Sequence, residues 1–305
     1  MNNTNSILLV GSVALDTIET PQTRRENLLG GSVTYALVSA SLESPVHVVG
    51  VVGKDFPAEG HELFRSHAAG LTDFQIRDGS TFRWGGRYHE NMDQRKTLFT
   101  ELGVFADFDP QLALGNCNHP YVFLANIHPA LQLSVIEQCN ADCTFVVDTM
   151  NLWIETTPRE LEQVLARTDI LLINESEAAL LTGTEDLPKA AQALRERGPD
   201  TVVIKLGSQG TVVAGAETAV RIGVYPVSQV VDTTGAGDTF GGGFVSALAR
   251  GMDLGEALIN GAAWASFCVE AFGISASSRV DKSALDLRRA RIRETLTLEI
   301  GKTLL

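Results

Sequence analysis

The residues best suited to chemistry lie in the segment 230–240, which reads VVDTTGAGDTF. Two valines are expected to end a buried strand, and a loop with Gly235 and Gly237 follows them. Glycine has no Cβ, so the backbone there can turn tightly and approach a ligand closely. Apolar residues recur every four positions from Phe240 onward, which predicts a helix that begins at this loop. Free N–H groups at the start of a helix attract anions, so we expect an oxyanion or a phosphate to bind here.

Asp238 directly follows the second glycine and places a carboxylate beside the expected anion site. A carboxylate is a poor ligand for a phosphate, but it suits a base that takes a proton beside a transferring phosphoryl group. The alternative interpretation is a glycine-rich turn with an acidic helix cap. The Walker A string and the protein-kinase motifs do not occur in the sequence.

The composition is that of a soluble globular protein with one large α/β core. The 305 residues are 44% hydrophobic and carry a formal net charge of −13, from 24 Lys and Arg against 37 Asp and Glu. This acidic balance argues against a nucleic-acid partner. The sequence has no signal-peptide pattern and no apolar run as long as a membrane span. We therefore expect no membrane partner. The four cysteines form no metal-type pair, which fits a reduced, cytoplasmic setting.

Short apolar runs that alternate with helical stretches predict a mainly parallel sheet covered by helices on both faces. The expected strands are residues 7–10, 46–52, 121–125, 144–147, 170–173 and 202–204. Polar residues follow these strands, at the edge where open α/β sheets bind ligands. They include Asp16, Asn126, Asp148, Asn174 with Glu177, and Lys205. Helix capping explains any one of them, but their repetition at one edge favours a binding site.

Residues 72–102 differ, because they predict an exposed β-hairpin. Alternation along a strand puts Phe82, Trp84 and Tyr88 on one face. Arg83 and Arg87 fall on the opposite face, which faces either solvent or an anionic substrate.

Together these motifs resemble the ribokinase-like (PfkB) family of carbohydrate and nucleoside kinases. DTTGAGD matches the C-terminal signature of that family, and the resemblance runs from Gly11 to about Ser277 with its elements in order. It implies one ribokinase-like three-layer α/β/α domain over residues 1–305, with a mainly parallel central sheet. It also implies a small β-lid built from two insertions, at about 15–29 and 72–102, which forms a homodimer contact in some members.

The resemblance implies a role for each motif. Asp238 would be the catalytic base, and the N–H groups of Gly235, Ala236 and Gly237 would form the anion hole. The substrate-binding residues would be Asp16, Gly30, Gly31, Tyr35 and Asn126. The nucleotide-binding residues would be Asn174, Lys205, Gly207, Gly210 and Thr233, and Glu177 would act on the metal. Tyr35 replaces the usual asparagine of the family, which suggests a differently shaped or more aromatic acceptor pocket.

The implied reaction transfers the γ-phosphoryl group of ATP to a hydroxyl of a sugar. Mg²⁺ would be the cofactor, and residues 273–277 correspond to a segment that helps hold a monovalent cation such as K⁺. Three alternatives are open: a nucleoside kinase, a sugar-phosphate kinase that uses Arg83 and Arg87 for the second phosphate, and a nucleotide-binding regulator without catalysis. The intact Asp238 and Glu177 argue against the regulator.

Overall fold

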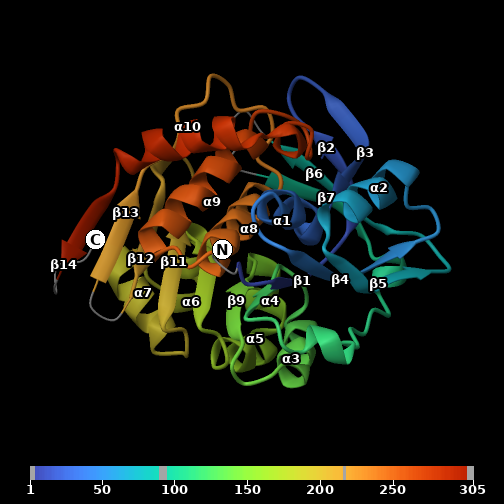
Figure 1. Ribbon diagram of the computed structural model, residues 1–305, viewed down its shortest axis with the longest axis horizontal. Helices are drawn as coiled ribbons and strands as arrows, with labels where there is room; N and C mark the ends of the chain where they lie inside the picture. The colour runs from blue at the N-terminus through green and yellow to red at the C-terminus, as the bar shows by residue number, and fades with distance from the viewer. Residues whose placement is uncertain (1–3, 89–94, 216–217, 301–305) are drawn as a thin grey trace.

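The computed structural model describes residues 4–88, 95–215 and 218–300, and it contains two β-sheets (Figure 1). The larger sheet has the strand order β14-β13-β12-β11-β10-β9-β8-β1-β4-β5. Its strands are β1 (Ile7–Val10), β4 (Val46–Gly53), β5 (Gly70–Arg77), β8 (Tyr121–Leu124), β9 (Thr144–Asp148), β10 (Ile170–Asn174), β11 (Thr201–Lys205), β12 (Thr211–Ala214), β13 (Thr218–Ile222) and β14 (Thr297–Ile300).

The strands from β5 to β11 in this order pair in parallel, while β12, β13 and β14 extend the sheet in antiparallel fashion. Each of the six apolar runs expected from the sequence is a strand of the parallel part. These strands are buried on both faces, which is why they read as continuous hydrophobic runs. The prediction of a mainly parallel central sheet is confirmed.

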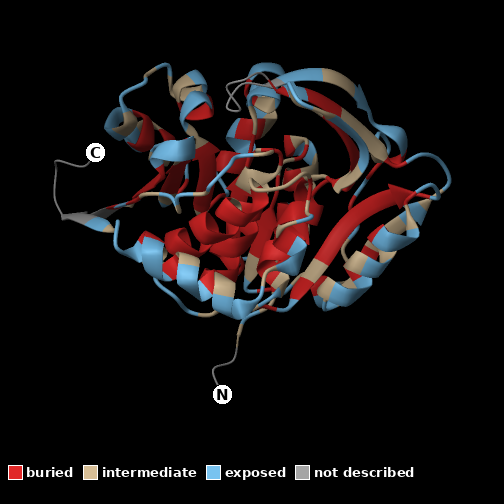
Figure 2. Cartoon of the chain, turned by 90° about the horizontal axis from the view of Figure 1, so that it is seen from above, coloured by how far each residue is buried: buried red, intermediate tan, exposed pale blue. Residues whose placement is uncertain are grey.

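Helices cover both faces of the large sheet (Figure 1). One layer contains α1 (Ser32–Ser41), α2 (Ala58–His67), α8 (Ala236–Ala249), α9 (Leu254–Cys268) and α10 (Lys282–Arg293). The other contains α3 (Pro129–Gln138), α4 (Asn151–Thr156), α5 (Pro158–Leu165), α6 (Glu175–Thr182) and α7 (Leu187–Arg195). Figure 2 shows the buried sheet and the inner helix faces in red, with exposed residues on the outer helix faces. None of the helices in the described ranges is long and apolar enough to cross a membrane.

The smaller sheet has the order β3-β2-β6-β7, with β2 (Ala14–Glu19), β3 (Arg24–Gly30), β6 (Phe82–Tyr88) and β7 (Arg95–Glu101). It therefore joins two segments that are far apart in the sequence. The second segment was expected to begin at residue 72, but residues 70–77 form β5, which pairs with β4 in the large sheet. The reason is packing, because Phe74 of β5 stacks on Phe64 of α2 with ring centroids 4.7 Å apart.

The expected strand before the signature loop is not present. Val230 and Val231 lie in the irregular segment between β13 and α8, and Val230 is 42% exposed. The main-chain N–H of Val231 donates to the carbonyl of Val269 at 2.7 Å. The segment is thus tied to the end of α9, and α8 begins from a loop and not from a strand.

Candidate active site

The carboxyl ends of the parallel strands bring the predicted site residues to one edge of the large sheet. In the parallel register, Asn174 at the end of β10 lies opposite Lys205 at the end of β11. The signature loop reaches the same edge, because a Cβ on Gly237 would lie 3.3 Å from Nζ of Lys205. This edge is where open α/β sheets bind their ligands.

The start of α8 forms the expected glycine-rich turn. Gly235 is the N-cap residue, with φ of 73°, a left-handed conformation that favours glycine. Asp238 lies in the first turn of the helix. The N–H of Ala236 donates to the carbonyl of Thr233 at 3.2 Å, which closes the turn. The first N–H groups of a 14-residue helix therefore lie beside a carboxylate, in the field of the helix dipole.

Lys205 lies among carboxylates at this edge. Its Nζ is 2.8 Å from Oδ2 of Asp148 at the end of β9, and both side chains are largely buried. Burial alone would lower the pKa of Lys205, but the nearby carboxylates of Asp148, Glu177 and Asp238 outweigh it and raise that pKa. The ammonium group is therefore charged and is held next to the signature loop, residues 232–238. No role could be assigned to Asp148 from the sequence beyond its expected position at a strand end, and it is the last residue of β9.

Asn174 and Glu177 form a capping box at the start of α6. Oδ1 of Asn174 accepts from the N–H of Glu177 at 2.8 Å, and Oε2 of Glu177 accepts from the N–H of Asn174 at 3.0 Å. The capping interpretation of this pair is confirmed. The buried carboxylate of Glu177 also acts on the charge of Lys205, so it is part of the site electrostatics.

The acceptor side contains Asp16 and the glycine pair. Asp16 of β2 is 3% exposed, and a Cβ on Gly30 would overlap its carboxylate. Glycine is therefore required at residue 30 for the carboxylate to lie against the β3–α1 junction. Gly31 is the N-cap residue of α1. Asn126 lies beside this helix start, because its carbonyl accepts from the hydroxyl of Ser32 at 3.3 Å.

Two of the proposed binding residues already have protein partners. Oδ1 of Asn126 accepts from Nε1 of Trp153 at 2.8 Å, and its amide nitrogen lies 3.2 Å from Sδ of Met150. The carbonyl of Thr233 belongs to the turn described above. The remaining nucleotide candidates, Gly207 and Gly210, lie in the turn that joins β11 to β12, directly after Lys205.

Tyr35 lies beneath the signature loop. A Cβ on Gly235 would overlap its ring, and the side chain is only 1% exposed. Its hydroxyl is buried and has no hydrogen-bond partner among the described residues. Burial, with Asp16 as the first of several acidic neighbours, raises the pKa of Tyr35 well above its usual value. The residue therefore supports the loop from below, and its ring does not line an open pocket wall.

The two arginines of β6 are engaged by acidic and amide groups. Nη2 of Arg83 lies 3.0 Å from Oδ2 of Asp55, and its Nη1 donates to Asn27 at 2.7 Å. Nε of Arg87 lies 2.7 Å from Oε2 of Glu19. Both positive charges are therefore compensated within the protein.

Tyr88 makes a contact that the sequence did not predict. Its hydroxyl lies 2.8 Å from Oγ1 of Thr234 in the signature loop. Alternation placed Tyr88 on the apolar face of β6 but could not identify what that face covers.

The family model for pfkB family carbohydrate kinases matches residues 5–281. The chain belongs to the pfkB family. Among the relatives of this pfkB family member, the cytidine kinase of Thermococcus kodakarensis is 29% identical over 262 residues, which cover 82% of this chain and 91% of that protein. The ribokinase of Arabidopsis thaliana is 39% identical over 136 residues, covering 43% of this chain and 36% of that one.

Solved structures confirm the fold of this pfkB family member. A nucleoside kinase from Methanocaldococcus jannaschii superposes with a TM-score of 0.77 at 23% identity, covering 94% of this chain and 98% of that one. Arabidopsis thaliana ribokinase, solved with ribose and ATP, gives 0.75 at 24% identity over 94% and 99% of the two chains. An E. coli protein solved with ATP and Mg²⁺ gives 0.79 at 18% identity over the same shares. The ribokinase-like three-layer fold is thereby established.

Proposed function

We propose that this protein is an ATP-dependent kinase that transfers the γ-phosphoryl group to a hydroxyl of a neutral sugar, with a nucleoside as the alternative acceptor. The observation that carries the proposal is the signature loop at the start of α8, where Asp238 lies in the first turn and Lys205 lies beside Gly237. Family membership supports the reaction class. The four-stranded sheet is proposed to act as the lid of the acceptor site.

Phosphoryl transfer depends on alignment and charge stabilisation more than on covalent help from the protein. Asp238 takes the proton of the acceptor hydroxyl as the hydroxyl oxygen attacks the γ-phosphorus, and the bond from that phosphorus to the bridging oxygen breaks and releases ADP. The N–H groups of Gly235 and Gly237 stabilise the charge on the equatorial oxygens, and the N–H of Ala236 would join them by sharing its bond to Thr233 with the phosphoryl group. Asp16, held against Gly30, orients the acceptor through its hydroxyl groups. Lys205, with Gly207 and Gly210 in the adjoining turn, would contact the nucleotide phosphates.

The residues present fit a Mg²⁺ ion that is held mainly by phosphates and water. Within the described ranges no group of three or more His, Cys, Asp or Glu residues forms a cage for a metal. Mg²⁺ in kinases commonly uses only one or two protein carboxylates, and Glu177 is the proposed one, through water, with Asn174 at its side. When bound, the ion neutralises phosphate charge.

A K⁺ site near residues 273–277 is also proposed, because the fully buried carboxylate of Asp232 accepts from the N–H of Gly273 at 3.3 Å.

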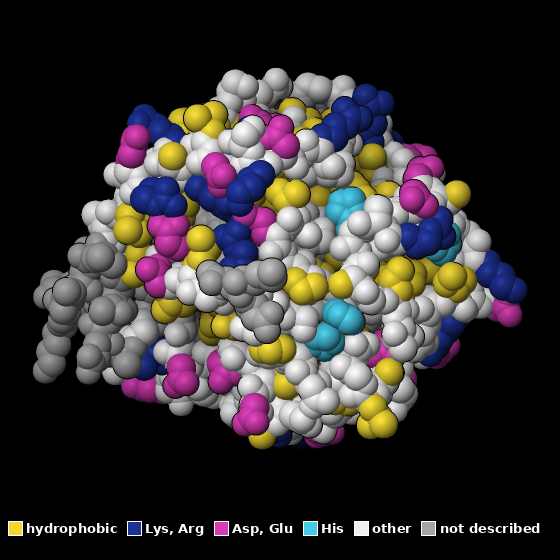
Figure 3. Space-filling view, viewed as in Figure 1, with side chains coloured by type: hydrophobic (Ala, Val, Ile, Leu, Met, Phe, Trp, Pro, Cys, Tyr) yellow, Lys and Arg dark blue, Asp and Glu magenta, His cyan; other side chains and the backbone are white. Residues whose placement is uncertain are grey.

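Charge at the site favours a neutral acceptor. Asp16 and Asp238 contribute negative charge, and the ammonium group of Lys205 is already paired with Asp148. The arginines of β6 are compensated by Asp55 and Glu19. On the face shown in Figure 3, Lys and Arg side chains also lie interspersed with Asp and Glu. An acceptor with a second phosphate would therefore be repelled, because like charges in a shared site are unfavourable.

A substrate panel tests this proposal. With ATP, the protein is expected to phosphorylate a neutral sugar or nucleoside, and kcat/KM for phosphorylated sugars should be lower by at least about tenfold, equivalent to about 1.4 kcal/mol. The cytidine kinase and ribokinase relatives make cytidine and ribose the first two acceptors to try.

The double variant Arg83→Ala with Arg87→Ala should keep the acceptor KM, because both side chains form ion pairs within the protein. A rise in KM confined to an anionic acceptor would instead assign the arginines to the acceptor pocket.

Glu177→Gln separates the metal role from the capping role. A glutamine side-chain oxygen can still accept from the N–H of Asn174, so the capping box and α6 should persist. Loss of the carboxylate charge should raise the Mg²⁺ concentration for half-maximal rate by about tenfold or more. Asp186→Asn, which keeps an N-cap acceptor at the start of α7, is the matched control. An unchanged Mg²⁺ titration would leave Glu177 with the capping role alone.

A further inference from the structure

Tyr88 joins the small sheet to the loop that is proposed to hold the transferring phosphoryl group. It is the last residue of β6, and its Oη lies 2.8 Å from Oγ1 of Thr234. Tyr88 is 4% exposed and Thr234 is 6% exposed. Water does not compete for a buried hydroxyl–hydroxyl bond, so this contact restricts both residues more than a surface bond would.

Each polar group of Thr234 has a defined partner. Its N–H donates to Oδ1 of Asp232 at 2.9 Å, and its carbonyl lies 3.4 Å from Sγ of Cys268. Those two partners belong to the signature segment itself and to the end of α9. The hydroxyl of Thr234 also bonds the carboxylate of Asp232, and its bond to Tyr88 links the loop to the small sheet.

The residue after Thr234 is also in contact with a tyrosine. Gly235 lies against the ring of Tyr35, which comes from α1. Tyr88 and Tyr35 therefore contact consecutive residues of the loop, Thr234 and Gly235. Gly235 is the first of the three residues whose N–H groups are proposed to form the anion hole, and Ala236 and Gly237 follow it.

We propose that Tyr88 is a positioning residue for phosphoryl transfer, because it fixes the signature loop through the hydroxyl of Thr234. The inference rests on the proposed kinase function. The anion-hole N–H groups must meet charge that develops only in the transition state, so their placement affects kcat more than substrate binding. A small displacement of such groups is costly, since a misplacement of about 1 Å can reduce a rate by about 10²-fold. Because Tyr88 belongs to the small sheet, the position of the signature loop also depends on the position of that sheet.

The test uses the full-length protein and the best acceptor from the substrate panel. Tyr88→Phe keeps the ring and removes the hydroxyl, while Thr234→Val removes the partner hydroxyl at nearly constant shape. Each single variant is expected to lower kcat by about tenfold and to leave the KM for ATP within about twofold. The double variant should resemble Thr234→Val, which loses both the bond to Tyr88 and the bond to Asp232, so that Tyr88→Phe adds nothing further to it. Thr234→Ser, which keeps a hydroxyl, should retain more activity than Thr234→Val.

Tyr121→Phe is the matched control, since Tyr121 is at the amino end of β8, at the opposite edge of the sheet. A wild-type kcat in Tyr88→Phe, or effects of the two single variants that multiply in the double variant, would overturn the positioning role while the kinase function stands. Absence of turnover by the wild-type protein with every acceptor would overturn the proposed function and this role with it. If Tyr88→Phe does not fold, the comparison of Thr234→Val with Thr234→Ser gives the same decision.

Discussion

Asp238→Asn is expected to lower kcat by about 10²–10⁴-fold, the usual contribution of a positioned acid or base. The side chain lies in the first turn of α8, beside the loop that begins at Gly235. Asparagine has nearly the same size but cannot accept the hydroxyl proton, so the loop and the nucleotide site should persist. Calorimetric titration with ATP should give a Kd close to that of the wild type, and steady-state kinetics should show the loss in kcat.

Asp253→Asn provides the matched control for this experiment. Asp253 is the N-cap residue of α9, and its side chain accepts from the N–H of Glu256 at 2.9 Å. Asparagine is an equally good N-cap, so this variant removes an aspartate charge without affecting the site or the fold. If Asp238→Asn kept the wild-type kcat while the family reaction was present, Asp238 would have a capping role and another base would have to be sought.

The parallel sheet could be predicted from the sequence because its strands are buried on both faces. A strand such as β10 (Ile170–Asn174) has no solvent-facing side, so its sequence is a short apolar run that ends in a polar residue. Once such strands are parallel, their carboxyl ends must lie at one edge. This is why Asn174 and Lys205, which are far apart in the sequence, could be assigned to one region before the structure was known.

The contacts within the site could not be predicted in the same way. Lys205 pairs with Asp148 and Tyr88 pairs with Thr234 across 57 and 146 residues. No local pattern specifies such partners, because they depend on how the sheet and its flanking helices pack. The position of Tyr35 is a similar case, since the sequence showed an unusual residue but gave no sign that its ring lies beneath Gly235.

The two errors in the fold have a related cause. Val230 and Val231 have a high β propensity, yet the chain there is held by the end of α9 and not by a neighbouring strand. The segment 70–77 has a mixed burial pattern typical of an edge strand, so its sequence resembles that of the exposed hairpin that follows it. Tertiary packing, through Phe74, decides that it joins the large sheet.

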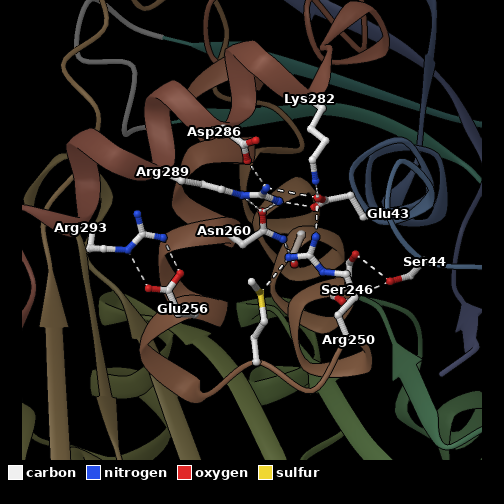
Figure 4. A network of polar contacts seen from close by, with 12 residues as sticks. Glu43, Ser44, Ser246, Arg250, Glu256, Asn260, Lys282, Asp286, Arg289 and Arg293 are labelled. Atoms are coloured by element: carbon white, nitrogen blue, oxygen red, sulfur yellow. Dashed lines mark hydrogen bonds and ion pairs between the residues drawn. The ribbon is translucent and has the colours of Figure 1, made fainter. Parts of the chain in front are cut away.

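A buried ionic cluster holds together the helix layer that carries the site (Figure 4). The side chain of Glu43, which follows α1, is 7% exposed, and its carboxylate contacts Arg250 at the end of α8 and Arg289 of α10. Lys282 at the start of α10 lies 3.2 Å from the same carboxylate. Burial would raise the pKa of Glu43, but the cations, Arg289 first, more than compensate and lower it. The cluster therefore joins the C-terminal ends of α1 and α8, whose N-terminal ends lie beside Gly31 and Gly235.

Glu43→Gln is expected to reduce the free energy of unfolding by about 3–5 kcal/mol, because Arg250 loses the carboxylate that it contacts and the buried Arg289 keeps, among the described residues, only that of Asp286. This is a large part of the total of about 5–15 kcal/mol that is typical of a folded domain. Since the pKa of Glu43 is lowered in the folded state, its contribution is fully present above the ordinary glutamate pKa of 4.5 and is lost as the pH falls through the folded-state pKa. Urea unfolding at pH 7 and at low pH measures both effects, and the difference between the wild type and the variant should shrink in acid.

Glu62→Gln is the control for this prediction, because Glu62 pairs with Arg65 on the exposed surface of α2. Exposed ion pairs contribute about 0–1 kcal/mol, so the control should unfold close to the wild type. At low temperature, where Glu43→Gln is still folded, its KM values should remain near those of the wild type, since the cluster lies at the far ends of the helices from the signature loop. Equal stability of the two variants would mean that water or rearranged side chains compensate Arg250 and Arg289, and the cluster would then have no role in holding α1 against α8.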